Sequence, residues 1–252
     1  MWVKIASVLV GVITVAPTPA YAVDDPPFQA RVYATREGLV GKNTANGHVI
    51  TSRDHFVSLP SRRGLSAKGS GDRTVQVCAD GGRCEYAPVW DVGPWNTHDD
   101  YWDPDRQEWG DLPRGVPQAQ AAWYDDYNGK KDEFGRTVDN PAGLDLADGT
   151  FWDGLQLDTN AWVTVTFLWS GVSPGAGQAQ GLINLRSGPG TDYRVVGYAA
   201  PYAVLPVECQ TQGSGSAPPT GGTSCSAAST SRTPTSPTRS NPRRAEPRMT
   251  RW

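Results

Sequence analysis

The chain has 252 residues, of which 26 are acidic and 23 are basic. That length is enough for about two domains. Residues 23–209 hold 25 acidic and 16 basic residues, whereas residues 210–252 hold one acid and six arginines. The acidic body argues against nucleic acid as a partner, because binding a phosphate backbone needs a basic surface.

The first 22 residues have the features of a secretory signal peptide. Lys4 supplies a positive charge, residues 5–16 form a short apolar run, and Ala20-Tyr21-Ala22 fits a cleavage site. We therefore expect the mature protein to be secreted, and to be extracellular or associated with the cell wall. We expect no membrane span, because no later segment is long and apolar enough to cross a bilayer.

Several segments have the alternation of a half-buried strand. Residues 30–34 predict a first strand. Residues 74–78 and 85–90 alternate on either side of Asp80-Gly81-Gly82, which holds residues that tolerate turn conformations. We therefore predict a β-hairpin.

The cysteines favour disulfide bonds, as expected in an exported chain. Cys78 and Cys84 lie at the two inner ends of the predicted hairpin, so their pairing is local. Cys209 with Cys225 is a second, less secure pairing. We expect no metal and no other cofactor, since the chain has no Cys-x-x-Cys pair and no close histidines for zinc.

Residues 95–136 form an acidic insertion whose carboxylates alternate with aromatic residues. We favour a solvated loop for these acids, with a structural calcium ion as the alternative. Residues 118–127 contain good helix formers and follow Pro117, which predicts a short helix. The acids in question are Asp99, Asp100, Asp103, Asp105, Glu108 and Asp111.

The last part of the chain divides into four pieces. Residues 160–169 have the clearest strand pattern, and residues 170–180 are rich in Gly, Pro, Ser and Ala, as a linker is. Residues 181–209 begin a second small module, with strands expected at 195–199 and 203–209. Residues 210–252 show no apolar periodicity and are expected to be disordered. The reversal of charge there also allows a tail that is read out of frame.

Motifs in the first module resemble those of a known family. Thr44-Ala45-Asn46-Gly47, Leu59-Pro60-Ser61, Asp91-Val92-Gly93-Pro94-Trp95 and Leu144-Asp145-Leu146-Ala147 occur in the order found in the rare lipoprotein A family of septal lytic transglycosylases. The resemblance covers residues 30–169 and implies a double-psi β-barrel, which expansins and barwin-like proteins share. His48 stands where that family has Glu, and Val92 where it has Arg.

The second module, Leu182-Ile183-Asn184-Leu185-Arg186-Ser187-Gly188-Pro189-Gly190-Thr191, is similar to bacterial SH3-like domains. That resemblance implies attachment to the cell envelope, although residues 181–209 cover only part of such a domain. The fold class is therefore expected to be mainly β. It combines a double-psi β-barrel-like domain carrying a helical acidic insertion with a partial SH3-like β module and a disordered tail.

Two acids are candidates for catalysis. The resemblance places Asp91 and Asp145 on rigid elements of the barrel, with Asp145 in a polysaccharide groove. A lytic transglycosylase needs one carboxylic acid to protonate the leaving oxygen, and a hydrolase generally uses two. The structural alternatives are that Asp91 binds turn amides and that Asp145 caps a helical turn.

Aromatic residues are the candidates for substrate binding. Eight of the ten tryptophans lie between Trp90 and Trp169. Trp95, Tyr101, Trp102 and Trp152 are expected to form a platform for sugar rings, although a place in the core is an equal alternative for each. His55 is expected to be a binding contact or a structural residue.

These features favour a secreted, monomeric protein that binds peptidoglycan or a related cell-wall polysaccharide through a barrel groove. The departures at His48 and Val92 favour binding over cleavage. The alternatives are a peptidoglycan lytic transglycosylase with an Asp general acid and a barwin-like module that binds or inhibits another protein.

Overall fold

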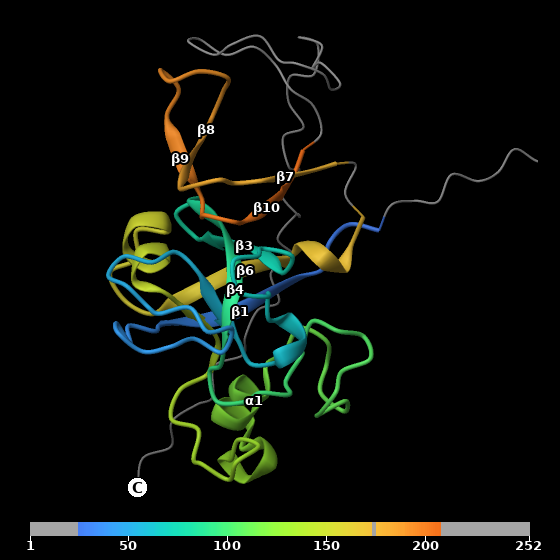
Figure 1. Cartoon of the computed structure of the whole chain (residues 1–252). Coiled ribbons are helices and arrows are strands. Elements are labelled where there is room, and N and C mark those ends of the chain that lie inside the picture. Colours follow the sequence, from blue (N-terminus) through green and yellow to red (C-terminus); the bar gives the residue numbers. More distant parts are fainter. Residues whose placement is uncertain (1–24, 173–174, 208–252) are drawn as a thin grey trace, which may run out of the picture.

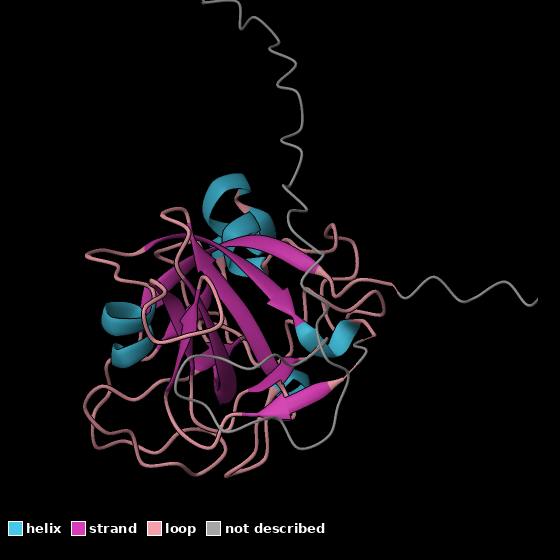
Figure 2. Ribbon diagram, turned by 90° about the horizontal axis from the view of Figure 1, so that it is seen from above, coloured by secondary structure: helices cyan, strands magenta, loops and turns pink. Residues whose placement is uncertain are grey.

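The computed structural model describes residues 25–172 and 175–207. This part of the chain is mainly β, with a few short helices (Figures 1 and 2). The strands are β1 (Gln29–Arg36), β2 (Val57–Leu59), β3 (Thr74–Ala79), β4 (Cys84–Val92), β5 (Ala142–Leu146), β6 (Ala161–Phe167), β7 (Ala176–Gln178), β8 (Ile183–Arg186), β9 (Val195–Ala199) and β10 (Val204–Pro206). The helical segments are η1 (Arg62–Gly64), α1 (Gln118–Asp125), η2 (Tyr127–Lys130), η3 (Thr150–Gly154) and η4 (Leu168–Ser170).

Strands β1 to β6 form a closed six-stranded barrel. The strands neighbour one another in the order β2-β5-β1-β6-β3-β4, and a further pairing of β2 with β4 closes the ring. Two of these pairings, β1 with β5 and β2 with β4, are parallel, and the other four are antiparallel. A closed barrel leaves none of its six strands as an unpaired edge.

The alternation read from the sequence places branched side chains inside the barrel. Val32, Val75, Val77, Val163 and Val165 are all fully buried in one core cluster. Within a strand these valines occupy alternate positions, as expected for a sheet with one face covered. The predicted strands in β1 and β6 are therefore confirmed, although the last ends at Phe167, where η4 begins.

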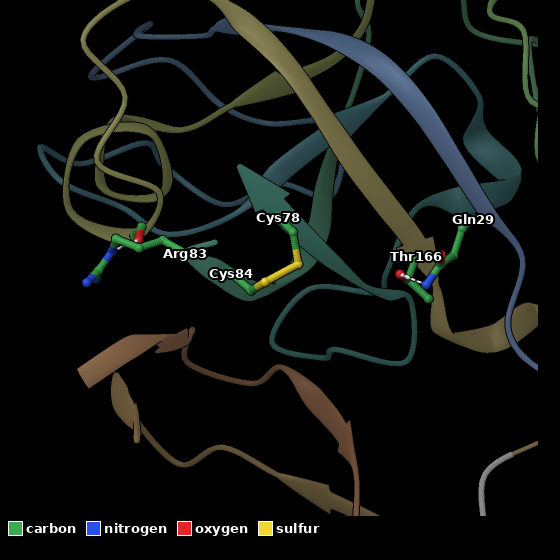
Figure 3. The surroundings of a disulfide bond; sticks show 6 residues. Gln29, Cys78, Arg83, Cys84 and Thr166 are labelled. Atoms are coloured by element: carbon green, nitrogen blue, oxygen red, sulfur yellow. Dashed lines mark hydrogen bonds between the residues drawn. A yellow bond between two sulfur atoms is a disulfide. The ribbon is translucent and has the colours of Figure 1, made fainter. Parts of the chain in front are cut away.

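The predicted hairpin is formed by β3 and β4, and Cys78 pairs with Cys84 across it. The two sulfur atoms form a disulfide bond at the inner end of the hairpin (Figure 3). The predicted disulfide is therefore confirmed. The alternative pairing of Cys209 with Cys225 lies outside the described residues, as do residues 1–22 and 210–252.

The acidic insertion between β4 and β5 contains the predicted helix, α1. Figure 1 shows the insertion at one end of the barrel and β7 to β10 beyond the opposite end. The expectation of a solvated loop is wrong for Asp99 and Asp100, which are 1% and 0% exposed. Asp99 is paired with Arg106 and accepts a hydrogen bond from the Gln118 amide, and Asp100 is paired with Arg63. Arginine and backbone amides thus neutralise these two buried acids.

The C-terminal strands are attached to the barrel sheet. Strand β9 pairs with β4 in parallel, with Gly197 opposite Cys84, and β8 pairs with β9. A Cβ atom at Gly197 would lie 1.7 Å from the Cys84 carbonyl oxygen, so this close approach requires glycine. Strand β7, which pairs with β10, falls inside the expected linker of residues 170–180. That segment is therefore not irregular throughout.

Within the described ranges, we find no helix with the length and apolar character needed to span a membrane.

Candidate functional site

Three carboxyl groups meet at one edge of the barrel, and strand register explains why. Strands β1 and β5 are parallel with Thr35 opposite Asp145, and β2 and β4 are parallel with Ser58 opposite Asp91. Ser58 also lies opposite Asp145 on the antiparallel neighbour β5. Glu37 follows β1 directly and is held there by a 2.8 Å hydrogen bond from its amide to the Leu146 carbonyl.

Asp145 is the carboxyl best placed to exchange a proton with a ligand. It is half-buried and lines a groove of about 490 Å³. The Thr35 hydroxyl donates a hydrogen bond to its Oδ1 atom. Burial raises the pKa of Asp145 to about 6, while the Thr35 hydrogen bond acts in the opposite direction and the charge of Asp91 adds to the rise. The Oδ2 atom faces Gly93, where a Cβ atom would lie 4.0 Å away.

Glu37 also lines the groove and is held in its neutral form. The Ser58 hydroxyl donates a 2.5 Å hydrogen bond to Glu37 Oε2. Its Oε1 atom is buried and receives no hydrogen bond from the described residues. Burial is the largest of the effects that raise the pKa of Glu37 to about 9, and the neighbouring carboxyls of Asp91 and Asp145 raise it further. Glu37 therefore carries its proton at neutral pH.

Asp91 organises the backbone beside the other two acids. Its Oδ1 atom accepts hydrogen bonds from the amides of Ala45 and Val92, each 2.8 Å long. The first of these bonds ties the turn at residues 44–47 to the barrel. The geometry thus matches the turn-binding role that the sequence allowed for Asp91.

The groove has an aromatic and basic rim around its acidic floor. Trp95 lines it, and its indole nitrogen donates a 3.3 Å hydrogen bond to Asn140. Arg36 and Arg136 line it as well, and they are paired with Asp148 and Asp132. Of the four aromatic residues expected in the platform, Trp95 is the one that lines this groove.

The structure places Tyr101 and Trp102 in the barrel core, where neither ring offers a face to a ligand. They are 0% and 2% exposed. The Tyr101 hydroxyl donates to the Gly143 carbonyl, and Trp102 stacks on Phe167 with 5.1 Å between ring centroids. The core alternative describes both residues.

Trp152 lies at the surface, but its ring already has cationic partners. The guanidinium carbons of Arg36 and Arg53 are 4.7 and 4.6 Å from its centroid. Arg36 also lines the groove, so Trp152 supports one side of the rim. Both contacts are favourable cation–π interactions that a stacked sugar would have to replace.

His55 is a buried structural residue in this fold. Its Nδ1 atom lies 3.0 Å from Glu85 Oε1, which also accepts a hydrogen bond from the Thr150 hydroxyl. Burial raises the pKa of Glu85. His55 is not among the residues that line the groove. His48, which replaces the family glutamate, is paired with Asp54 at 2.7 Å.

The site also contains three residues that the sequence did not reveal, namely Thr35, Glu37 and Ser58. Thr35 and Glu37 lie just beyond the end of the first predicted strand, and polar residues there were the available signal. Ser58 gave no local signal, because its role depends on pairing with two strands distant in sequence.

Comparison with known proteins identifies the barrel as a family domain. No curated protein matches the chain. A family model described as a domain of unknown function (DUF8814) matches residues 28–166, which is more than half of the chain. The match starts one residue before β1 and ends one residue before the end of β6, so it spans the barrel and its insertion. The chain therefore belongs to the DUF8814 family.

Proposed function

We propose that the barrel groove binds peptidoglycan or a related cell-wall polysaccharide, and that Asp145 protonates a glycosidic oxygen held there. The observation that carries this proposal is a half-buried carboxyl on a rigid strand, with a pKa of about 6, at the floor of an open groove. A general acid must hold a proton near neutral pH and reach the leaving oxygen.

We further propose that the barrel is of the double-psi type. The closure at six strands and the two parallel pairs within an otherwise antiparallel ring support this assignment. The order of the four motifs in the sequence supports it as well. In this arrangement the motifs containing Asp91 and Asp145 come together at the groove, although they are more than 50 residues apart in the chain.

The proposed reaction needs one acid. Asp145 gives its proton to the glycosidic oxygen as the bond from that oxygen to the anomeric carbon breaks. A hydroxyl of the same sugar attacks the anomeric carbon, and its proton passes to the Asp145 carboxylate. The acid is thereby restored and the product is an anhydro sugar, as in lytic transglycosylases. No water is consumed.

The neighbouring groups prepare Asp145 for this role. Because Glu37 is neutral at pH 7, it adds no negative charge to the groove. The carboxyls of Glu37 and Asp145 can therefore lie close together without repelling one another. Thr35 holds Oδ1 and leaves Oδ2 for the substrate. Trp95 offers an aromatic surface for a sugar ring at the rim.

The cellular setting in this proposal is the cell wall. The signal-peptide features expected for residues 1–22 support export, and the resemblance of residues 181–209 to SH3-like domains supports attachment to the envelope. Of that segment the structure describes β8, β9 and β10, and β9 pairs with β4.

The test is a sedimentation assay with purified peptidoglycan, followed by mass spectrometry of the supernatant. We expect the chain in the pellet and anhydro-muropeptides in solution. Asp145→Asn should stay in the pellet and release products at least about a hundredfold more slowly. Asp125→Asn, an exposed acid outside the groove, should behave as wild type.

Each other result has a clear meaning. Wild-type chain in the pellet without products would leave polysaccharide binding and remove the catalytic role of Asp145. Chain that stays in solution without products would overturn the cell-wall proposal and favour a protein partner.

A further inference from the structure

Three metal-ligating side chains converge in the acidic insertion, away from the groove. His98, Glu108 and Glu133 each offer a donor atom, and these three atoms lie within 4.8 Å of one another. None of the three lines the groove. They come from three separate segments of the insertion, so no short sequence motif connects them.

Two of the three donors are fixed by the surrounding structure. Glu133 Oε1 accepts hydrogen bonds from the amide of Thr97 at 2.8 Å and from its hydroxyl at 2.5 Å. Glu133 Oε2 lies 3.1 Å from His98 Nδ1. The Glu133 amide in turn donates to Asn96 Oδ1, and His98 forms a backbone bridge with Ser61. Hydrogen bonds of this kind orient metal ligands in proteins.

The third donor, Glu108, has no bonding partner among the described residues, yet its carboxylate approaches that of Glu133. Other acids of the insertion are balanced differently: Asp99, Asp100 and Asp132 each form an ion pair with an arginine. Neither Glu108 nor Glu133 has an arginine or lysine partner in this part of the chain. Two carboxylates at such a distance repel one another unless a cation lies between them.

We propose that His98, Glu108 and Glu133 bind a zinc ion. An imidazole nitrogen with two carboxylates suits zinc, whereas calcium prefers oxygen ligands alone. His98 Nδ1 and Glu133 Oε2, 3.1 Å apart, form an ion pair when the imidazole is protonated. Little movement would bring them to the roughly 3.3 Å that separates two ligands of one tetrahedral zinc ion. The fourth position is open to water. The ion would join the loop before α1 to the loop after it.

This site differs from both possibilities raised by the sequence, which were solvated acids or calcium bound by them. Cys-x-x-Cys pairs and close histidines are absent from the chain, and the donors become neighbours through folding alone. The proposal is independent of the proposed function, since it involves no residue of the groove.

Isothermal titration calorimetry with zinc chloride tests the proposal on the full chain, without an affinity tag and after removal of metal with EDTA. We expect one zinc ion per chain and a higher Tm in its presence, because a ligand that binds only the folded state stabilises it. Calcium chloride at the same concentrations should give neither effect.

Variants assign the ligands. His98→Gln and Glu108→Gln should each weaken zinc binding at least about tenfold. Glu108 is exposed and unpaired, so its variant should fold normally. Asp125→Asn removes the same charge from another exposed acid of the insertion and should bind zinc as wild type. Absence of zinc binding, equal binding by Glu108→Gln and Asp125→Asn, or binding unchanged in His98→Gln would overturn the proposal.

Discussion

The hydroxyl of Ser58 donates a 2.5 Å hydrogen bond to the carboxyl of Glu37. Ser58 is 2% exposed and sits on β2 between the strands that carry Asp91 and Asp145. Ser58, on the shortest strand of the barrel, therefore contacts Glu37, which the sequence did not reveal. It also lies beside Asp91 and Asp145, which the sequence did reveal.

Replacing Ser58 with Ala should destabilise the fold modestly. The change removes a buried hydrogen bond, which contributes about 1 kcal/mol to the free energy of unfolding. The same bond opposes the rise in the Glu37 pKa, so that pKa should move further upward. Urea unfolding at pH 7 measures the first effect, with Ser52→Ala as control, since Ser52 is exposed. Equal loss in both variants would contradict this account.

Stability should decrease as pH rises from about 5 to about 9. The unfolded chain releases the Glu37 proton near the ordinary pKa of 4.5, whereas the folded chain keeps it until about 9. Between these values the folded state binds more protons, so the free energy of unfolding falls with rising pH, by up to about 1.4 kcal/mol per pH unit. Asp145 acts with the same sign between 3.8 and about 6.

Glu37→Gln isolates this contribution, because glutamine keeps the shape of the side chain but does not titrate. Urea unfolding at several pH values should give a flatter profile for this variant than for wild type. Asp125→Asn should keep the wild-type slope. A profile for Glu37→Gln that parallels wild type would show that Glu37 is ionised in the folded protein.

Trp95→Ala should weaken retention on purified cell wall about tenfold, which corresponds to a loss of about 1.4 kcal/mol. The indole lines the groove, and its removal takes away the aromatic surface for a sugar ring. Trp123→Ala is the matched control, since Trp123 is 42% exposed on α1 and does not line the groove. Cosedimentation at increasing wall concentration gives both affinities. Equal affinities would place the sugar site elsewhere.

Gly154→Ala should be among the most destabilising single changes in the chain. A Cβ atom there would lie 1.6 Å from Glu85 Oε2, inside the buried cluster with His55 and Thr150. Overpacking of this kind costs about 3 kcal/mol. Gly81→Ala meets nothing within 4 Å and should leave Tm almost unchanged. Thermal unfolding of the two variants compares them directly, and similar values would disprove the predicted clash.

Local sequence patterns were enough to predict four elements of the fold. The hairpin of β3 and β4, its disulfide, helix α1 and strand β6 all follow from alternation, turn residues and helix formers within short stretches. Tyr101 and Trp102 could not be distinguished from Trp95, because an aromatic residue in an irregular loop has no periodicity to mark its buried face. Asp99 and Asp100 suggested solvated acids, because their arginine partners are fixed only by the fold.

The candidate site was predicted in part for a similar reason. Asp91 and Asp145 lie in recognisable motifs, whereas Glu37 joins them only through the parallel pairing of β1 with β5. Parallel strands are distant in sequence, so their register leaves no local trace.

Strand β4 pairs with β3, β2 and β9, and it also carries Asp91. Strands β4 and β9 pair in parallel over Cys84–Tyr86. A force applied along β4 would therefore load the backbone hydrogen bonds of this pairing together, in shear. If the C-terminal strands hold the wall while the groove holds a glycan, tension between them would pass along the strand that bears the site. Force on the C-terminal strands would thus reach the strand of Asp91 through backbone hydrogen bonds.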